Sequence, residues 1–133
     1  MFLANLAEEQ KPAFLDLAQA LIAADGVLSS EEASMMEQYK LEMALTTTSV
    51  ESQGQVEQAV GVFKDASVTV KKQVIFELVA LAYADNDYAD EENRFLGKIV
   101  ASLGLEAAFI EKCSAYVGEL TDLYDRIGKL VSE

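Results

Sequence analysis

The spacing of apolar residues along the chain predicts helices throughout. From Pro12 to Ala24, apolar side chains recur three and four positions apart, which places them on one face of a helix. Long stretches rich in Ala, Leu, Glu and Gln follow, without the frequent turn residues that an all-β protein needs. We therefore expect an all-α fold of six to seven helices. The expected segments are 12–24, 31–45, 56–63, 68–84, 91–103, 105–117 and 120–131.

The expected helix ends are marked by residues with known capping preferences. Ser29 and Glu32 have the spacing of a capping box, in which each side chain binds the backbone of the other residue. The polar run from Thr46 to Ser49 should stop the second helix, because its side chains compete for backbone hydrogen bonds. Gly104 is expected to end the fifth helix in a left-handed conformation, so that two separate helices follow it.

Two expectations concern which side chains are buried. Glu77 stands alone in the apolar run from Val74 to Leu81, and we expect it on the exposed face of its helix. The alternative is that Glu77 pairs with a lysine or adds a ligand to the acidic turns described below. Met35, Met36 and Met43 are expected to fill the core rather than to form a pliable binding surface.

An internal repeat organises the chain. A shift of 60 residues aligns Ala24-Asp25-Gly26 with Ala84-Asp85-Asn86, and Glu31-Glu32 with Glu91-Glu92, without a gap. Each copy has the pattern of a helix, a tight acidic turn and a second helix, and two such amphipathic pairs can bury their apolar faces against each other. We therefore expect one domain, a bundle built from two duplicated helix-loop-helix units. The domain covers 1–133, and the repeat units span approximately 12–45 and 72–105.

The charge of the chain narrows the choice of partners. Ten basic and 23 acidic residues give a formal net charge of -13, which repels phosphate backbones and anionic lipid headgroups. Nucleic acid binding and membrane insertion are therefore not expected, whereas a cation or a basic protein partner suits such a surface. The N-terminal residues lack the basic region of a signal peptide, and the longest charge-poor run, 78–84, is too short to span a bilayer. A cytoplasmic location is expected.

The residue types that most enzymes use for catalysis are scarce. The chain has no His, one Cys and no Gly-x-Ser-x-Gly elbow, so pairs of nucleophile and base are missing. Catalysis by paired carboxylates needs an acid in an apolar pocket, whereas the candidate acids lie on turns that should be solvated. Cys113 is expected to act as a small buried hydrophobe. We therefore expect a protein without enzymatic activity.

The acidic turns are the strongest candidate for a binding site. No basic side chain lies between Asp85 and Glu92, and two carboxylates about 4 Å apart repel by about 4 kcal/mol at an effective dielectric of 20. A bound cation would relieve this repulsion. Oxygen ligands without His favour calcium, magnesium or manganese over zinc or copper. The candidate metal ligands are Asp25, Glu31, Glu32, Asp85, Asp87 and Glu92.

A second explanation of the acidic turns needs no metal. Carboxylates in the first turn of a helix are stabilised by about 0.3 to 1 kcal/mol each, because they lie at the positive helix end. Neither turn has the spacing of an EF-hand; counted from Asp85, loop positions 6 and 12 hold Asp90 and Leu96 in place of Gly and Glu. Asp25 and Asp85, however, follow their helices, where a negative charge is unfavourable without a turn hydrogen bond or a ligand. Both explanations stay open.

The paired acidic turns resemble the TerB-like family, which is named for a tellurite-resistance protein. The residues that carry the resemblance are Ala24-Asp25-Gly26, Ser29 and Glu32, with Ala84-Asp85 and Glu92 in the second copy. The resemblance implies an all-helical fold and a cytoplasmic role in stress-linked or chaperone-linked systems. It also implies acidic turns that are suspected of holding divalent metal. Nothing in the chain points specifically to tellurite.

The second turn departs from that pattern. Asn86 stands in place of Gly, and Ala89 stands in place of the capping Ser. Asp90 is expected to cap instead, which would start the following helix one residue later and shift Glu91 and Glu92 relative to the turn. The resemblance therefore carries metal ligands over to the second turn less directly than to the first.

The function expected from these features is that of a TerB-like binding module of the cytoplasm, with a stress-response or tellurite-resistance-like role. It would bind a divalent hard cation through its two acidic turns. The alternative is a metal-free acidic module that docks a basic partner by electrostatic complementarity. The two differ in their response to ions, because a metal site responds to one type of cation at low concentration and a diffuse acidic face responds to ionic strength.

Overall fold

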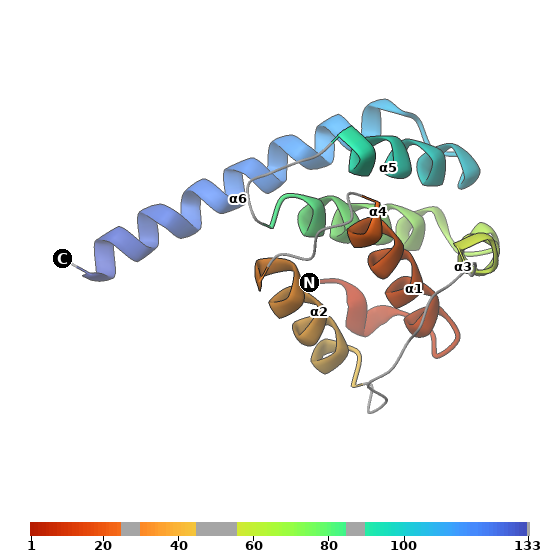
Figure 1. Cartoon of the computed structure of the whole chain (residues 1–133), viewed down its shortest axis with the longest axis horizontal. Coiled ribbons are helices and arrows are strands. Elements are labelled where there is room, and N and C mark those ends of the chain that lie inside the picture. Colours follow the sequence, from red (N-terminus) through yellow and green to blue (C-terminus); the bar gives the residue numbers. More distant parts are fainter. Residues whose placement is uncertain (25–29, 45–55, 85–89, 133) are drawn as a thin grey trace.

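The computed structural model describes residues 1–24, 30–44, 56–84 and 90–132 (Figure 1). These residues form six α-helices and a short 3₁₀ helix, and no strand occurs among them, so the expected all-α fold is confirmed. The elements are η1 (Leu3–Asn5), α1 (Gln10–Ala23), α2 (Ser30–Glu42), α3 (Val56–Lys64), α4 (Val68–Ala82), α5 (Asp90–Ser102) and α6 (Ala108–Ser132).

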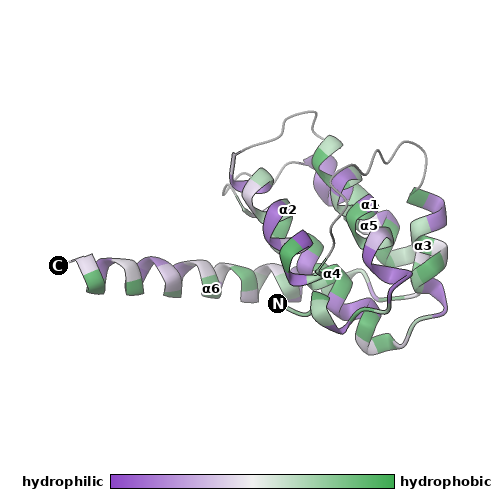
Figure 2. Cartoon of the chain, turned by 90° about the horizontal axis from the view of Figure 1, so that it is seen from below, coloured by the Kyte–Doolittle hydropathy of each residue, from purple (hydrophilic) through white to green (hydrophobic). Residues whose placement is uncertain are grey.

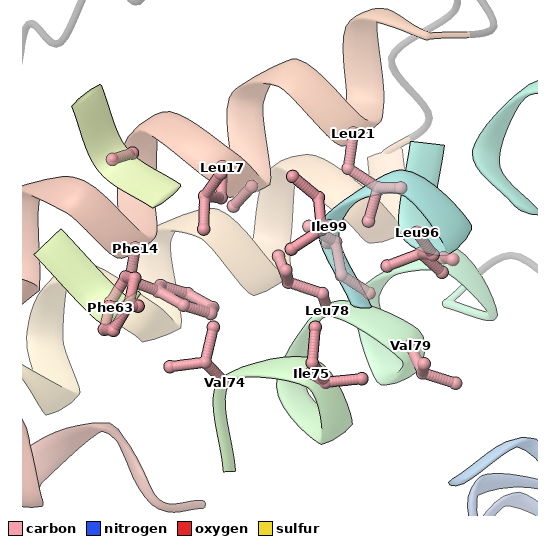
Figure 3. Packing of buried hydrophobic residues seen from close by; sticks show 14 of the residues in the cluster. Phe14, Leu17, Leu21, Phe63, Val74, Ile75, Leu78, Val79, Leu96 and Ile99 are labelled. Carbon is pink, nitrogen blue, oxygen red and sulfur yellow. The ribbon is translucent and has the colours of Figure 1, made fainter. Parts of the chain in front are cut away.

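The core lies between α1 and α4, the two most apolar of the long helices. Figure 1 shows α4 running through the middle of the molecule, with α5 on one side and α1 and α2 on the other. Helix α4 packs against all five other helices, and α1 packs against α2, α3, α4 and α5. Burying one large apolar side chain of this kind contributes about 1.5 to 3 kcal/mol. The central side chains, shown in Figure 3, are Phe14, Leu17, Leu21, Phe63, Val74, Ile75, Leu78, Val79, Leu96 and Ile99.

The methionines expected in the core are largely there. Met36 and Met43 are buried, and Met35 is partly buried and packs against the same cluster. An unbranched side chain can fill irregular gaps between helices, which suits the space between α2 and the central pair. The expected connector from Thr46 to Ser49 lies outside the described residues.

The helix bounds agree with the predicted repeat, although the duplication itself stays a prediction. Helices α2 and α5 each contain 13 residues, and their first residues, Ser30 and Asp90, are 60 positions apart. In the first half of the chain α1 packs against α2 and α3, and in the second half α4 packs against α5 and α6. The contacts of α1 and α4 are thus similar in the two halves of the chain.

One expected helix start is wrong. Helix α5 begins at Asp90 and not one residue later, so Asp90 is its first helical residue. Glu91 and Glu92 consequently hold the same positions in α5 that Glu31 and Glu32 hold in α2. Helix α5 thus begins at Asp90 although Ala89 stands in place of Ser in the sequence, and the helix packs against α1 and α4.

The cap at Gly104 is confirmed. Gly104 has a φ angle of 73°, in the left-handed region where a side chain would be strained. The Leu105 N–H donates to the Val100 carbonyl at 3.0 Å, and the Gly104 N–H donates to the Ala101 carbonyl at 3.1 Å. These two bonds make a Schellman motif, which ends α5 and turns the chain toward α6.

The two separate helices expected after Gly104 are in fact one. Helix α6 runs without interruption from Ala108 to Ser132 and includes Gly118 and Gly128. Glycine in an exposed helix costs up to about 1 kcal/mol relative to alanine, which weakens a helix without ending it when apolar neighbours are spaced to continue it. The C-terminal half of α6 extends well beyond the other helices (Figures 1 and 2). Among the described residues, no helix combines the length and apolarity needed to cross a membrane.

Replacing Gly118 with alanine is expected to stabilise the protein. Gly118 is exposed, and a Cβ atom added there meets no other atom within 4 Å. Alanine loses less backbone entropy than glycine on entering a helix, so the free energy of unfolding should rise by about 0.5 to 1 kcal/mol. Urea unfolding followed by circular dichroism measures the change.

Gly104→Ala is the control for that substitution. The added Cβ again meets no atom within 4 Å, but the positive φ angle is unfavourable for alanine, so the free energy of unfolding should fall by about 1 kcal/mol. A Gly118→Ala chain that is no more stable than the wild type would contradict a continuous α6 at this position.

Candidate functional site

Four carboxylates are buried in the described part of the chain, and they are its only buried charged side chains. Asp16 and Glu77 lie within the central helices α1 and α4, and their exposed fractions are 8% and 3%. Glu32 and Glu92 lie in the first turns of α2 and α5, with exposed fractions of 2% and 1%. An ionised carboxylate is expensive to bury unless hydrogen bonds or a positive charge compensate it. Each of the four therefore calls for an explanation.

The partner of Glu77 is the N-terminal amine. The Met1 ammonium nitrogen lies 2.8 Å from Glu77 Oε1, and the Phe2 N–H donates to the same oxygen at 2.9 Å. Glu77 was expected on an exposed helix face, and that expectation is wrong. A lone carboxylate in an apolar run suggests exposure, but here the N-terminal segment folds over α4 and supplies both a positive charge and a donor.

Glu42 also binds the N-terminal segment. Glu42 and Glu77 together hold Met1, Phe2 and Leu3, and we call this set of contacts the N-terminal clamp. The Met1 ammonium lies 2.9 Å from Glu42 Oε1, and the Leu3 N–H donates to Glu42 Oε2 at 2.9 Å. The Tyr39 hydroxyl donates to the backbone carbonyl of Glu77 at 3.2 Å. These contacts join η1, the end of α2 and the middle of α4. The N-terminal segment thereby offsets the negative charges of Glu42 at the end of α2 and Glu77 in α4.

The clamp shifts the pKa values of the groups that it contains. Burial by itself lowers the pKa of the Met1 amine, but the hydrogen bonds and negative charges of Glu77 and Glu42 outweigh it and raise that pKa above 8.0. Burial, followed by the charges of Glu77 and Glu42, raises the pKa of Tyr39 well above 10.0. The amine is thus held charged and the phenol is held neutral at neutral pH.

Asp16 is the buried acid with the least compensation. Its Oδ1 atom is buried and has no hydrogen-bond partner among the described residues. Burial raises the pKa of the Asp16 carboxyl above its ordinary value of 3.8. A shift of 61 residues aligns Asp16 with Glu77 inside matching apolar strings, so the sequence did contain a signal for a buried acid in each central helix.

The structure separates the predicted metal ligands into two groups. Glu32 and Glu92 are buried and have interaction partners within the protein, whereas Glu31 is exposed and accepts a hydrogen bond from the Ser30 hydroxyl at 3.2 Å. The other candidates, Asp25, Asp85 and Asp87, lie outside the described residues. Over the ranges that the structure covers, no three His, Cys, Asp or Glu side chains are placed to hold one metal ion. The cation site at the two turns therefore stays a prediction.

Cys113 is buried on α6, as expected. Burial raises the pKa of its thiol to about 11, so little of the reactive thiolate exists at neutral pH. The side chain belongs to the apolar cluster between α6 and the rest of the bundle. Its position fits a small hydrophobic residue that fills the interface at the start of α6.

Removing the charge of Glu77 is expected to destabilise the protein. In Glu77→Gln, the Met1 amine and the Phe2 N–H lose an anionic acceptor, so the free energy of unfolding at pH 7 should fall by about 1 to 3 kcal/mol. Glu8→Gln is a matched control, because the Glu8 side chain is 88% exposed and pairs at the surface with Lys11, three residues later in the sequence. Urea unfolding of both variants measures the difference, and equal losses would contradict the role of the clamp.

The same clamp predicts a dependence on alkaline pH. A folded-state pKa raised above 8.0 means that the folded protein binds the amine proton more tightly than the unfolded chain does. This stabilisation is complete below pH 8 and is lost as the pH rises through the folded pKa. The free energy of unfolding should therefore fall on raising the pH from 7 to about 9, and Glu77→Gln should show a smaller fall. Identical slopes in the two proteins would contradict the assignment.

Comparisons with known proteins assign no family to the chain. It matches no protein-family model, no curated protein sequence and no solved structure. The resemblance to the TerB-like family therefore remains a hypothesis that rests on the residues of the two acidic turns.

Proposed function

We propose that the protein is a binding module without enzymatic activity, which holds a hard divalent cation at its two acidic turns. The observation that carries the proposal is the burial of Glu32 and Glu92, two carboxylates at matching positions in the repeat. Calcium, magnesium and manganese are the candidate ions, because the ligands on offer are carboxylate oxygens. The TerB-like resemblance and its stress-linked role belong to the same proposal.

The position of the two carboxylates supports this function. Each follows an acidic segment, 25–31 or 85–91, and each is almost fully shielded from water. Both have interaction partners within the protein, and the acids of the two turns add further carboxylate oxygens close to them in the sequence. A cation held by Glu32, Glu92 and the acids of the turns would offset the charge where the low dielectric makes it most costly.

A capping role for the same residues is the competing explanation. A glutamate three residues after the helix cap can accept a hydrogen bond from the backbone of the cap residue, and a negative charge there also suits the helix dipole. Both Glu32 and Glu92 occupy that position, given helices that begin at Ser30 and Asp90. Glutamine can make the same capping bond but is neutral. Substitution by glutamine therefore separates capping from metal binding.

The test is a thermal melt of chelator-treated protein with calcium, magnesium or manganese added singly against a matched ionic-strength control. A specific site at about 100-fold saturation should stabilise the wild type by about 2.7 kcal/mol with one of the ions. The double variant Glu32→Gln, Glu92→Gln should lose this response and still fold, because glutamine can accept the same capping hydrogen bond.

The matched control removes two exposed carboxylates in place of the two buried ones, so that the change in net charge is the same. Glu37 of α2 and Glu57 of α3 are exposed and belong to neither acidic turn, and Glu37→Gln, Glu57→Gln lowers the negative charge by the same amount. This variant should keep the response to the cation. An equal, small shift with every salt, or the same loss of response in both double variants, would rule out the proposed site.

The second candidate function is a metal-free acidic module that docks a basic partner. The observation that favours it is the distribution of charge: helix α6 has four acidic and three basic residues, so nearly all of the net charge of -13 lies on the rest of the chain. A surface of this kind attracts basic proteins through long-range forces that salt screens. A response to ionic strength alone in the same melts would favour this candidate.

A further inference from the structure

Helix α6 exposes an unusual number of large apolar side chains. Between positions 116 and 131, each of these exposed side chains has an exposed fraction of 45% to 76%. Single exposed apolar residues need no explanation, but a contiguous row of them marks a contact surface. The exposed row consists of Tyr116, Leu123, Tyr124, Ile127, Leu130 and Val131.

These side chains lie on one face of the helix. At 100° per residue they fall within an arc of about 120°, with the partly buried Leu120 inside it. Figure 2 shows the apolar positions recurring along the projecting part of α6. Five of the apolar residues are spaced alternately four and three apart, which is the repeat of a helix that packs along another helix. These five are Tyr116, Leu120, Leu123, Ile127 and Leu130.

The face continues an interface that already exists at the start of the helix. Ile110, Cys113 and Val117 are buried where α6 packs against α4 and α5. Past Leu120 the helix leaves the bundle, and no described segment covers its apolar face (Figure 1). The buried Cys113 and Val117 border the exposed row, so α6 passes from a face that packs on the bundle to an apolar face that is open.

The distribution of charge favours a second copy of this chain as the partner. Two chains of net charge -13 repel each other, but α6 carries four acidic and three basic residues and is nearly neutral. Two copies can therefore approach along α6 with little local repulsion, since charges beyond about 8 Å are largely screened at physiological salt. A basic partner would be drawn instead to the rest of the surface, where the negative charge lies.

Two charged residues at the edge of the apolar face indicate the orientation. Glu119 and Arg126 lie seven residues apart on the same edge of α6 and are exposed. When two identical helices pack antiparallel, like edges meet, so Glu119 of each copy would lie opposite Arg126 of the other. In a parallel pair this edge would meet the opposite edge of the second copy, where Tyr124 and Val131 offer no charge. The charges therefore match only in the antiparallel arrangement.

We propose that α6 pairs with α6 of a second copy in an antiparallel two-helix contact, with the two-fold axis close to Leu123. In this arrangement the C-terminal end of each α6 lies beside the N-terminal half of the other. That half borders an apolar groove of about 460 Å³, lined by Met1, Phe76, Tyr116, Glu119, Leu120 and Leu123. The proposal uses none of the candidate metal ligands, so its test is separate from the test of the proposed cation site.

The first test is the molar mass of the full chain over a wide concentration range, measured by sedimentation equilibrium. The wild type should approach twice its 14.5 kDa, and Leu123→Glu should weaken the self-association by about 100-fold or more, because each dimer would bury two charges. Leu123 is 45% exposed in the single chain, so the variant should fold. Leu41→Glu on α2 is the matched control, because Leu41 is 80% exposed and should leave the association unchanged.

Charge reversal tests the pairing of Glu119 with Arg126. Glu119→Arg alone and Arg126→Glu alone should each weaken the association by about 10-fold, because each places like charges opposite one another. The double variant Glu119→Arg, Arg126→Glu should return close to the wild-type affinity. A double variant as weak as the single ones would overturn the proposed register.

Thiol cross-linking tests the orientation in a Cys113→Ala background. In the Leu123→Cys variant, the thiols of the two copies would lie close together across the proposed axis. This variant should therefore form a disulfide-linked dimer on oxidation. Two Leu130→Cys sites would lie about 20 Å apart at 1.5 Å per residue and should not link. Linking through Leu130→Cys would show a parallel pair and overturn the antiparallel arrangement. A wild-type mass that stays at 14.5 kDa at every concentration would overturn the proposal altogether.

Discussion

The packing of α1 across α4 is the contact on which the other helices depend. Both helices are buried along much of their length, and every other helix of the described structure packs on at least one of them. Leu17 and Leu21 of α1 and Leu78 of α4 are fully shielded from water at this crossing (Figure 3). Because interiors of this kind are close-packed, the positions of α2, α5 and the N-terminal segment follow from how the central pair crosses.

A buried acid in each central helix is the unusual feature of this arrangement. Glu77 is compensated by the N-terminal amine and by the Phe2 N–H, which makes the N-terminal segment part of the structure rather than a loose end. Asp16, at the matching place in α1, has a buried oxygen without a hydrogen bond among the described residues and a raised pKa. Each half of the chain thus buries one acid in its central helix, but the surroundings of the two carboxylates differ. Such a difference is expected when only one half has a free amine within reach.

The two proposals concern different residues and depend on different physical interactions. The cation proposal rests on Glu32 and Glu92, two carboxylates that are almost fully buried at the start of their helices. The dimer proposal rests on the apolar face of α6, whose exposure to water is unfavourable in a single chain. Neither requires the other. A cation bound at the turns and a second copy bound along α6 would together reduce the self-repulsion and the apolar exposure that the chain has on its own.

The sequence by itself determined the helical class and most helix positions, because periodic apolar residues and a cap such as Gly104 act locally. It also determined that acids gather beside Glu32 and Glu92, which is a matter of composition. Only the tertiary structure decided that Glu77 is buried, since its partner amine lies 76 positions away in the chain. The continuation of α6 through Gly118 was likewise visible only in the structure, where the buried Val117 precedes the glycine and the partly buried Leu120 follows it. Local signals predict elements, whereas the compensation of a buried charge depends on which distant segments the fold brings together.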